Sequence, residues 1–357
     1  MKELILAINP GSTSTKVAVF ENQDAVLMVT IRHDPEELFG FDSISAQFPF
    51  RKKHVLETLR INKINIGELT AVVARGGALR PMSGGTYRVN ELMLEDCRNG
   101  YSGQHAINLA SLIADEIAKE KGLPCFIVDP PGMDEFPEIA RISGLPNMPR
   151  KSKFHALNQK AVGRWAAKNL GMKYEEARLV IAHIGGGTSI GAHENGRVID
   201  VNDCYDSEGP FTPERAGTLP VGAVVELCMS GDYTLDDIRK MLTGKGGVVA
   251  HLGTSDMREV VKRIEAGDEK ARLIYEAMAY QVAKTIGSQS TVLRGRVDAI
   301  VLTGGITYDE HFVEMITGRV AWIAPVKVYP GEEEMKALAE GALRVLKGDE
   351  EAKEYIV

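Results

Sequence analysis

The chain has 357 residues, a length that predicts two domains because a single core rarely exceeds about 200 residues. Hydrophobic residues make up 44% and charged residues 25% of it, as in ordinary globular proteins, and no apolar run reaches the roughly 20 residues of a membrane helix. The net charge of −7 argues against a broad nucleic-acid surface, which needs clustered Lys and Arg. We therefore expect neither a membrane segment nor a nucleic-acid partner.

The first predicted element is a strand over residues 4–8, followed by a polar turn over 9–16 and a second strand over 17–20. No signal-peptide features precede it, and the four cysteines show no CxxC spacing, so we expect a cytoplasmic protein. The turn offers backbone N–H groups, hydroxyls and one ammonium, which suits a triphosphate with Mg²⁺. A Ser/Thr-rich hairpin turn is the alternative interpretation. A Walker loop would lead into a helix, whereas a strand follows here.

The next segment predicts a strand over 71–74 that ends at Arg75, a helix over 105–121, and a buried strand over 124–128 that ends at Asp129. Five prolines between residues 130 and 149 indicate a loop-rich crossover. We place the first domain at residues 1–150 and the second at 151–334, with a C-terminal helix over about 335–357 that packs back on the first domain.

The second half predicts a helix over 155–169 and then repeats the opening pattern. The strand over 179–182 runs into His-Ile-Gly-Gly-Gly-Thr-Ser at 183–189, and a short strand and a turn follow. Leu179 lies 175 residues after Leu4, about half of the chain. This repeat indicates two domains that arose by duplication.

The remaining predicted elements are helices over 256–266, 269–291 and 332–346, and a buried strand over 297–303. That strand ends in Gly304-Gly305-Ile306. Such a turn lets an adenosine lie against bare backbone, although a simple strand-to-helix turn explains the glycines equally well.

Taken together, five motifs in this order resemble the acetate kinase family, and one resembles its butyrate kinase members in particular. The motifs are 9–16, Phe154-His155, 183–189, Phe211-Thr212-Pro213 and Thr303-Gly304-Gly305-Ile306, with Ala74-Arg75-Gly76-Gly77 as the butyrate kinase feature. The resemblance spans the whole chain. It implies an α/β fold of the actin, sugar kinase and heat-shock ATPase superfamily: two duplicated ribonuclease H-like domains, each a mixed five-stranded sheet flanked by helices, with the nucleotide in the cleft between them.

The resemblance also implies the reaction and the residues that carry it. The reaction is reversible phosphoryl transfer between ATP and a carboxylic acid, giving ADP and an acyl phosphate, with Mg²⁺ as cofactor and a homo-oligomer as the expected assembly. The implied catalytic residues are Arg75, His155, Asp129 and His105, and the implied metal ligands are Asp129 and Glu333. The implied nucleotide-binding residues are Asn9, Ser12, Ser14, Lys16, His183, Gly185, Gly186, Gly187, Thr188, Asp256, Arg258, Gly304, Gly305 and Ile306. The implied acyl pocket consists of Ala74, Gln104, Phe154 and Pro213.

Several of these residues also have plain structural interpretations. Arg75 follows a strand as a surface arginine would, Asp129 sits where a turn-capping carboxylate would, and residues 332–334 suit the first turn of a helix. His105 is as compatible with a satisfied polar side chain as with a cleft residue.

Two departures from the acetate kinase pattern concern arginines. Val72 stands where acetate kinases carry an Arg, with Arg75 in place of their His, and Leu219 follows Gly217-Thr218 where they carry a second Arg. We hypothesise that Arg75 and Arg215 replace this anion clamp. Ala74 stands where acetate kinases have Val, which leaves room for butyrate or isobutyrate.

Three other functions stay open on the sequence alone. They are an acetate or propionate kinase, a sugar kinase, and an actin-like ATPase that uses ATP as a conformational switch. The absence of an additional assembly domain argues against the switch. The Arg and His candidates argue against a sugar kinase, which needs an Asp base beside a hydroxyl.

Overall fold

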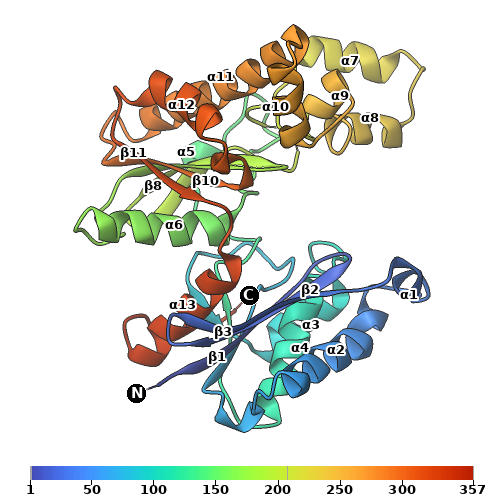
Figure 1. Ribbon diagram of the computed structural model, residues 1–357, viewed down its shortest axis with the longest axis vertical. Helices are drawn as coiled ribbons and strands as arrows, with labels where there is room; N and C mark the ends of the chain where they lie inside the picture. Colours follow the sequence, from blue (N-terminus) through green and yellow to red (C-terminus); the bar gives the residue numbers. More distant parts are fainter. Residues whose placement is uncertain (1, 207, 357) are drawn as a thin grey trace. The chain divides into compact units, whose positions relative to one another are not determined.

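The computed structural model describes residues 2–206 and 208–356, and the chain divides into two compact units (Figure 1). The first comprises residues up to Met133 together with Glu333 onward, and the second comprises Asp134–Glu332. The boundaries between the units thus lie after residues 133 and 332. The boundaries expected from the sequence lay after residues 150 and 334. Within the described residues, no helix is both long and apolar enough to cross a membrane.

The first unit is built on a six-stranded mixed sheet with the order β3-β2-β1-β4-β6-β5. Its strands are β1 (Leu4–Pro10), β2 (Ser14–Glu21), β3 (Asp24–Arg32), β4 (Ala71–Ala74), β5 (Thr86–Arg88) and β6 (Cys125–Val128). Its helices are α1 (Pro35–Phe39), α2 (Phe48–Ile61), α3 (Glu91–Asn99), α4 (Asn108–Lys119) and α13 (Glu334–Lys347). β1–β2–β3 pair antiparallel, and β1–β4–β6 pair parallel.

The second unit contains a five-stranded mixed sheet with the order β11-β10-β7-β8-β9. Its strands are β7 (Leu179–Ile184), β8 (Thr188–Glu194), β9 (Arg197–Val201), β10 (Ala299–Gly304) and β11 (Val326–Pro330). Its helices are α5 (Glu138–Arg141), α6 (Ala156–Asn169), α7 (Val221–Met229), α8 (Leu235–Leu242), α9 (Val248–Leu252), α10 (Met257–Glu265), α11 (Glu269–Val292) and α12 (Glu310–Val320).

The two sheets share one topology, which confirms the duplication predicted from the repeated turn. In each, an antiparallel meander (β1–β2–β3 or β7–β8–β9) is extended by two parallel strands (β4 and β6, or β10 and β11). The expectation of five strands in both sheets is wrong for the first unit. There the three-residue strand β5 adds an antiparallel sixth strand beside β6, and so short a strand has no readable alternation.

Helices cover both faces of each sheet (Figure 1). In the first unit α4 packs on β1, β4 and β6 from one side, and α13 packs on the same strands from the other. In the second unit α6 packs on β7 and β10, while α11 covers β7, β8 and β9. The central strands are therefore buried on both faces, as the apolar runs of β4, β7 and β10 require.

Candidate functional site

The polar turn over residues 9–16, which was predicted to bind phosphate and is called the first phosphate turn below, connects β1 to β2 and lies at the end of the sheet where the parallel strands also end. Asn9 pairs with Lys16 and Pro10 with Thr15, and the Gly11 N–H donates to the Ser14 carbonyl at 2.8 Å. Ser12 and Lys16 are exposed and Ser14 is half-buried. The turn thus presents its polar side chains and backbone to solvent.

Arg75 lies beside this turn because β4 runs parallel to β1 with Ala74 opposite Ile8. Its Nε donates to Oε1 of Glu334 at 3.3 Å, and Nδ2 of Asn9 donates to Oε2 of the same carboxylate at 2.9 Å. Arg75 is 7% exposed, and its Nη1 has no hydrogen-bond partner in the described part of the chain. An unpartnered buried guanidinium nitrogen is costly unless a ligand supplies the acceptor.

Asp129 ends β6, on the other side of β4 from the phosphate turn. It is fully buried with a left-handed φ of 38°, and its Oδ1 accepts the Gly85 N–H at 2.7 Å. Glu333 precedes α13, is well exposed and lies 3.9 Å from Nζ of Lys336. Of the three consecutive glutamates, it is Glu334 that contacts Asn9 and Arg75.

Sequence reasoning missed Arg51, a fully buried residue of α2 in the first unit. Its Nη1 donates to the carbonyls of Gly11 and Ser14 at 2.9 and 3.0 Å, and its Nη2 donates to the Ser12 carbonyl at 2.8 Å. Burial lowers the pKa of Arg51. The pKa of His105 is also lowered, mainly by burial and to a smaller extent by the positive charge of Arg51. The amphipathic pattern of α2 gave no signal for Arg51, because a cation on a helix usually faces solvent.

The repeated turn over residues 183–189, called the second phosphate turn below, connects β7 to β8 in the same way as the first turn connects β1 to β2. His183 pairs with Ser189 and Ile184 with Thr188, and the Gly185 N–H donates to the Gly187 carbonyl at 3.1 Å. Thr212 Oγ1 donates to the Gly186 carbonyl at 2.6 Å.

Arg215 lies directly against Gly187 of the second turn. A Cβ added at Gly187 would collide with the Arg215 guanidinium, which donates to the Cys204 carbonyl and lies over the Tyr205 ring. Gly187 is therefore the residue that lets this arginine approach the turn. The position fits the hypothesis that Arg215 serves as an anion-binding residue.

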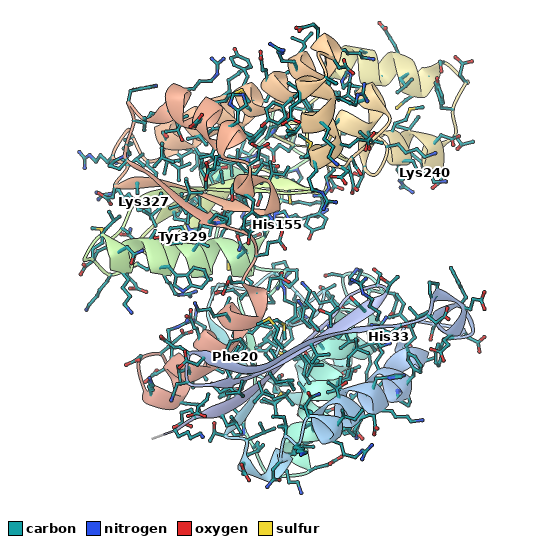
Figure 2. All side chains as sticks on the ribbon, in the orientation of Figure 1. Phe20, His33, His155, Lys240, Lys327 and Tyr329 are labelled. Atoms are coloured by element: carbon teal, nitrogen blue, oxygen red, sulfur yellow. The ribbon has the colours of Figure 1, made fainter. Side chains whose placement is uncertain are left out.

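The structure brings His155 and His183 together, with their rings stacked at 3.8 Å between centroids and 9° between planes. His155 precedes α6 (Figure 2), and its Nδ1 lies 2.9 Å from Ser189 Oγ. His183 is 1% exposed, with Nδ1 2.9 Å from Asn158 Oδ1 and Nε2 3.0 Å from Glu332 Oε1. Each imidazole therefore has a hydrogen-bonding neighbour at its Nδ1, and Nε2 of His183 lies beside the Glu332 carboxylate.

A cavity of about 960 Å³ opens in the second unit beside this turn. Its lining includes seven residues that matter here: Gly185, Gly186, Asp256, Arg258, Gly305, Ile306 and Glu332. Gly304 has φ of 97°, and a Cβ added there would collide with the Ile184 backbone, whereas a Cβ at Gly305 would meet nothing within 4 Å. Asp256 and Arg258 pair at the exposed rim at 2.8 Å, and the Arg258 hydrogen bond lowers the Asp256 pKa to about 2. The cavity is large enough for a nucleotide.

The predicted acyl-pocket residues are divided between the units. Ala74 is fully buried in the core of the first unit and Gln104 is exposed, while Phe154 and Pro213 are buried in the second unit. The described residues hold no group of three or more His, Cys, Asp or Glu side chains arranged to bind a metal. A magnesium ion that enters with ATP needs only one or two carboxylates, so the single buried Asp129 fits that mode of binding.

Comparison with solved structures places the whole chain in one fold. It is similar to acetate kinase from Porphyromonas gingivalis with 21% identity and a TM-score of 0.79, covering 96% of this chain and 100% of the other. A propionate kinase from Francisella tularensis is 20% identical with a TM-score of 0.73, and the match covers 95% of this chain and 98% of that one. The ROK hexokinase from Thermus thermophilus is 15% identical with a TM-score of 0.51, and the match covers 98% of this chain and 99% of that one. The molecule is therefore an α/β protein of the actin-like ATPase fold that acetate and sugar kinases share. Residues 147–324 match the model of the acetokinase family, so this half of the chain is similar in sequence to that family.

Proposed function

We propose that this chain transfers a phosphoryl group reversibly between ATP and a short-chain fatty acid carboxylate, butyrate or isobutyrate, giving an acyl phosphate and ADP. The observation that carries the proposal is the Arg75 guanidinium beside the first phosphate turn, buried, with Nη1 unpartnered among the described residues. A carboxylate or phosphoryl oxygen is the acceptor that this nitrogen lacks.

The proposed reaction requires cations that neutralise negative charge, and it does not require a general base. Carboxylic acids are ionised at neutral pH, so the acceptor is already nucleophilic, and the barrier lies in bringing two anions together. Arg75, Arg215 and the stacked His155 and His183 would neutralise and orient the transferred group. Asp129 and Glu333 are the candidate magnesium ligands, and the ion would add positive charge at the ATP phosphates.

The cavity in the second unit is the proposed nucleotide site. The glycine turn at Gly185–Gly187 would take phosphates, and the open Gly305 backbone would lie against the adenosine. Asp256 and Arg258 at the rim would face the base or ribose. In the first unit, Asn9, Ser12, Ser14 and Lys16 would contact the phosphoryl group being transferred.

A four-carbon acid is favoured because Ala74 replaces a larger side chain of acetate kinases. Acetate and propionate remain the alternative substrates, since the solved kinases similar to this chain act on those acids by name. We also expect a cytoplasmic homo-oligomer, as the acetate kinase resemblance implies.

Hydroxylamine trapping of acyl phosphate tests the proposal, with ATP, Mg²⁺ and a panel of straight and branched C2 to C6 acids. We expect hydroxamate from butyrate or isobutyrate at the highest kcat/KM. Acetate or propionate as the best substrate would instead assign the alternative. ATP hydrolysis without hydroxamate from any acid would contradict the proposal and favour a conformational switch, and phosphorylation of a sugar in a parallel assay would favour a sugar kinase.

A further inference from the structure

The first phosphate turn is hydrogen-bonded to the side chain of Arg51, a cation that makes no contact with solvent. Arg51 is 0% exposed, and each of its hydrogen-bond acceptors among the described residues is a neutral oxygen: the carbonyls of Gly11, Ser12 and Ser14, Thr15 Oγ1 and Gln47 Oε1. Arginine stays protonated in proteins, so a full positive charge lies against the turn, and in the part of the chain that the structure describes its hydrogen bonds go only to neutral dipoles.

These contacts fix the direction of the turn's amides. In a planar trans peptide the carbonyl of one residue and the N–H of the next point in opposite directions. Because the Gly11 and Ser12 carbonyls point at Arg51, the N–H groups of Ser12 and Thr13 point away from it. Both residues are exposed, and neither N–H has a hydrogen-bond partner within the part of the chain that the structure describes.

We propose that Arg51 is a positioning residue that turns the Ser12 and Thr13 amides outward as a paired anion site for the transferred phosphoryl group. The inference rests on the proposed function and names an element of that same site. Two successive outward N–H groups form a concavity that binds one phosphate oxygen, and the buried charge beneath raises its affinity for an anion. Arg51 itself cannot touch the phosphoryl group, because the turn lies between them.

A lysine cannot replace Arg51 in this role. The guanidinium reaches three carbonyls with two nitrogens in one plane, whereas an ammonium is a single point on a flexible stem. Arg51→Lys therefore keeps the charge and releases the turn. Lys52 is the matched control, because it is the next cation on α2 but pairs with Glu116 and Glu120 at 2.7 and 3.1 Å.

The test uses the full-length protein and inorganic phosphate as the probe, followed through the backbone amide resonances of Ser12 and Thr13. We expect phosphate to shift both resonances in the wild type, Arg51→Lys to weaken the phosphate Kd at least tenfold, and Lys52→Met to leave it within twofold. Unshifted Ser12 and Thr13 resonances in the wild type would overturn the inference, whether or not the variant folds. So would an Arg51→Lys protein that folds and binds phosphate as the wild type does.

A second measurement separates a positioning role from a merely structural one and from the proposed function itself. In Arg51→Lys we expect a lower kcat with any acid and an unchanged ratio of kcat/KM between butyrate and acetate, because the proposed acyl pocket does not include the turn. A changed ratio would contradict the assignment of Arg51 to the phosphoryl group. If the wild type binds phosphate at these amides but forms no acyl phosphate, the proposed function fails and the anion site stands.

Discussion

Nε of Arg75 and Oε1 of Glu334 lie 3.3 Å apart, although 259 residues separate them in the chain. The same carboxylate also accepts a hydrogen bond from Asn9, so Glu334 holds both the end of β1 and the end of β4. One edge of the guanidinium is thereby occupied, and the buried Nη1 is left for a ligand. Arg75 is thus both oriented by the protein and still able to bind an anion.

Replacement of Arg75 should impair the acid-dependent reaction. We expect Arg75→Lys to lower kcat/KM for the acid by about 10²-fold, because the ammonium keeps the charge but cannot reproduce the planar guanidinium hydrogen bonds, and a lost charged hydrogen bond costs about 1.5 to 3 kcal/mol. The control is Arg98→Lys, since Arg98 is an exposed residue of α3 that pairs with Glu91. Steady-state kinetics with the best acid of the panel measure the effect, and wild-type turnover in Arg75→Ala would reject the role of Arg75.

The sequence predicted the positions of the two polar turns and of the strand ends, because these features have local patterns. Apolar runs of four to six residues that end in Arg75, Asp129 or the glycines after β10 mark central strands and the sheet edge where they finish. The repeated turn also predicted the duplicated topology, which the order of the two sheets confirms.

The contacts that organise these turns were not predictable, because they join residues without a shared local pattern. Arg51 reaches the first turn from a helix about 40 residues later, and Glu334 reaches it from the last helix. A buried unpaired arginine is so rare that its sequence position carries no warning. Arg215 could be suspected only as a substitute for a missing arginine, and its approach to Gly187 depends on the path of the loop before α7.

Enlarging Ala74 tests the acyl-chain preference. We expect Ala74→Val to lower the ratio of kcat/KM for butyrate over acetate by about tenfold, since one methylene of room is worth about 1 to 3 kcal/mol. The control is Ala71→Val, because Ala71 is also fully buried in β4 but points to the opposite face of the sheet. Both variants should lose some stability through overpacking, and only Ala74→Val should change the ratio. An unchanged ratio would refute the pocket assignment.

The second turn offers a comparison of two adjacent glycines. A Cβ at Gly187 would collide with Arg215, whereas a Cβ at Gly186 would meet only Glu214 Oε2 at 3.8 Å. Gly187→Ala should therefore displace Arg215 and raise the KM for ATP about tenfold or more, and Gly186→Ala should change it far less. Equal effects of the two substitutions would show that the contact between Arg215 and Gly187 does not matter for ATP.

Gly305 tests whether the nucleotide lies in the cavity of the second unit. A Cβ at Gly305 would meet nothing within 4 Å, so Gly305→Ala should leave the melting temperature nearly unchanged. If the adenosine packs on this backbone, the added methyl should still raise the KM for ATP several-fold. Gly318→Ala in α12 is the control, because its Cβ also meets nothing but lies away from the cavity lining. Equal KM values for the two variants would place the adenosine elsewhere.

The buried His33 makes the first unit sensitive to acid. Nε2 of His33, which is labelled in Figure 2, lies 2.8 Å from Thr15 Oγ1. Burial, the Arg51 charge and His54 lower the pKa of His33 from 6.5 to about 4. Because the folded pKa lies below the unfolded value, the unfolded chain binds this proton first. The stability that the neutral ring contributes is full above about pH 6.5 and falls, by at most about 1.4 kcal/mol per pH unit, as the pH drops towards 4.

Replacing this ring should therefore remove one part of the acid sensitivity. His33→Gln keeps an acceptor for the Thr15 hydroxyl but has no proton to gain, so its melting temperature should fall less steeply than that of the wild type between about pH 6.5 and 4. Thermal unfolding followed by circular dichroism at half-unit pH steps measures the difference. His311→Gln, at an exposed position of α12, should follow the wild-type curve. Parallel curves for His33→Gln and the wild type would show that His33 is protonated in the folded protein as readily as in the unfolded chain.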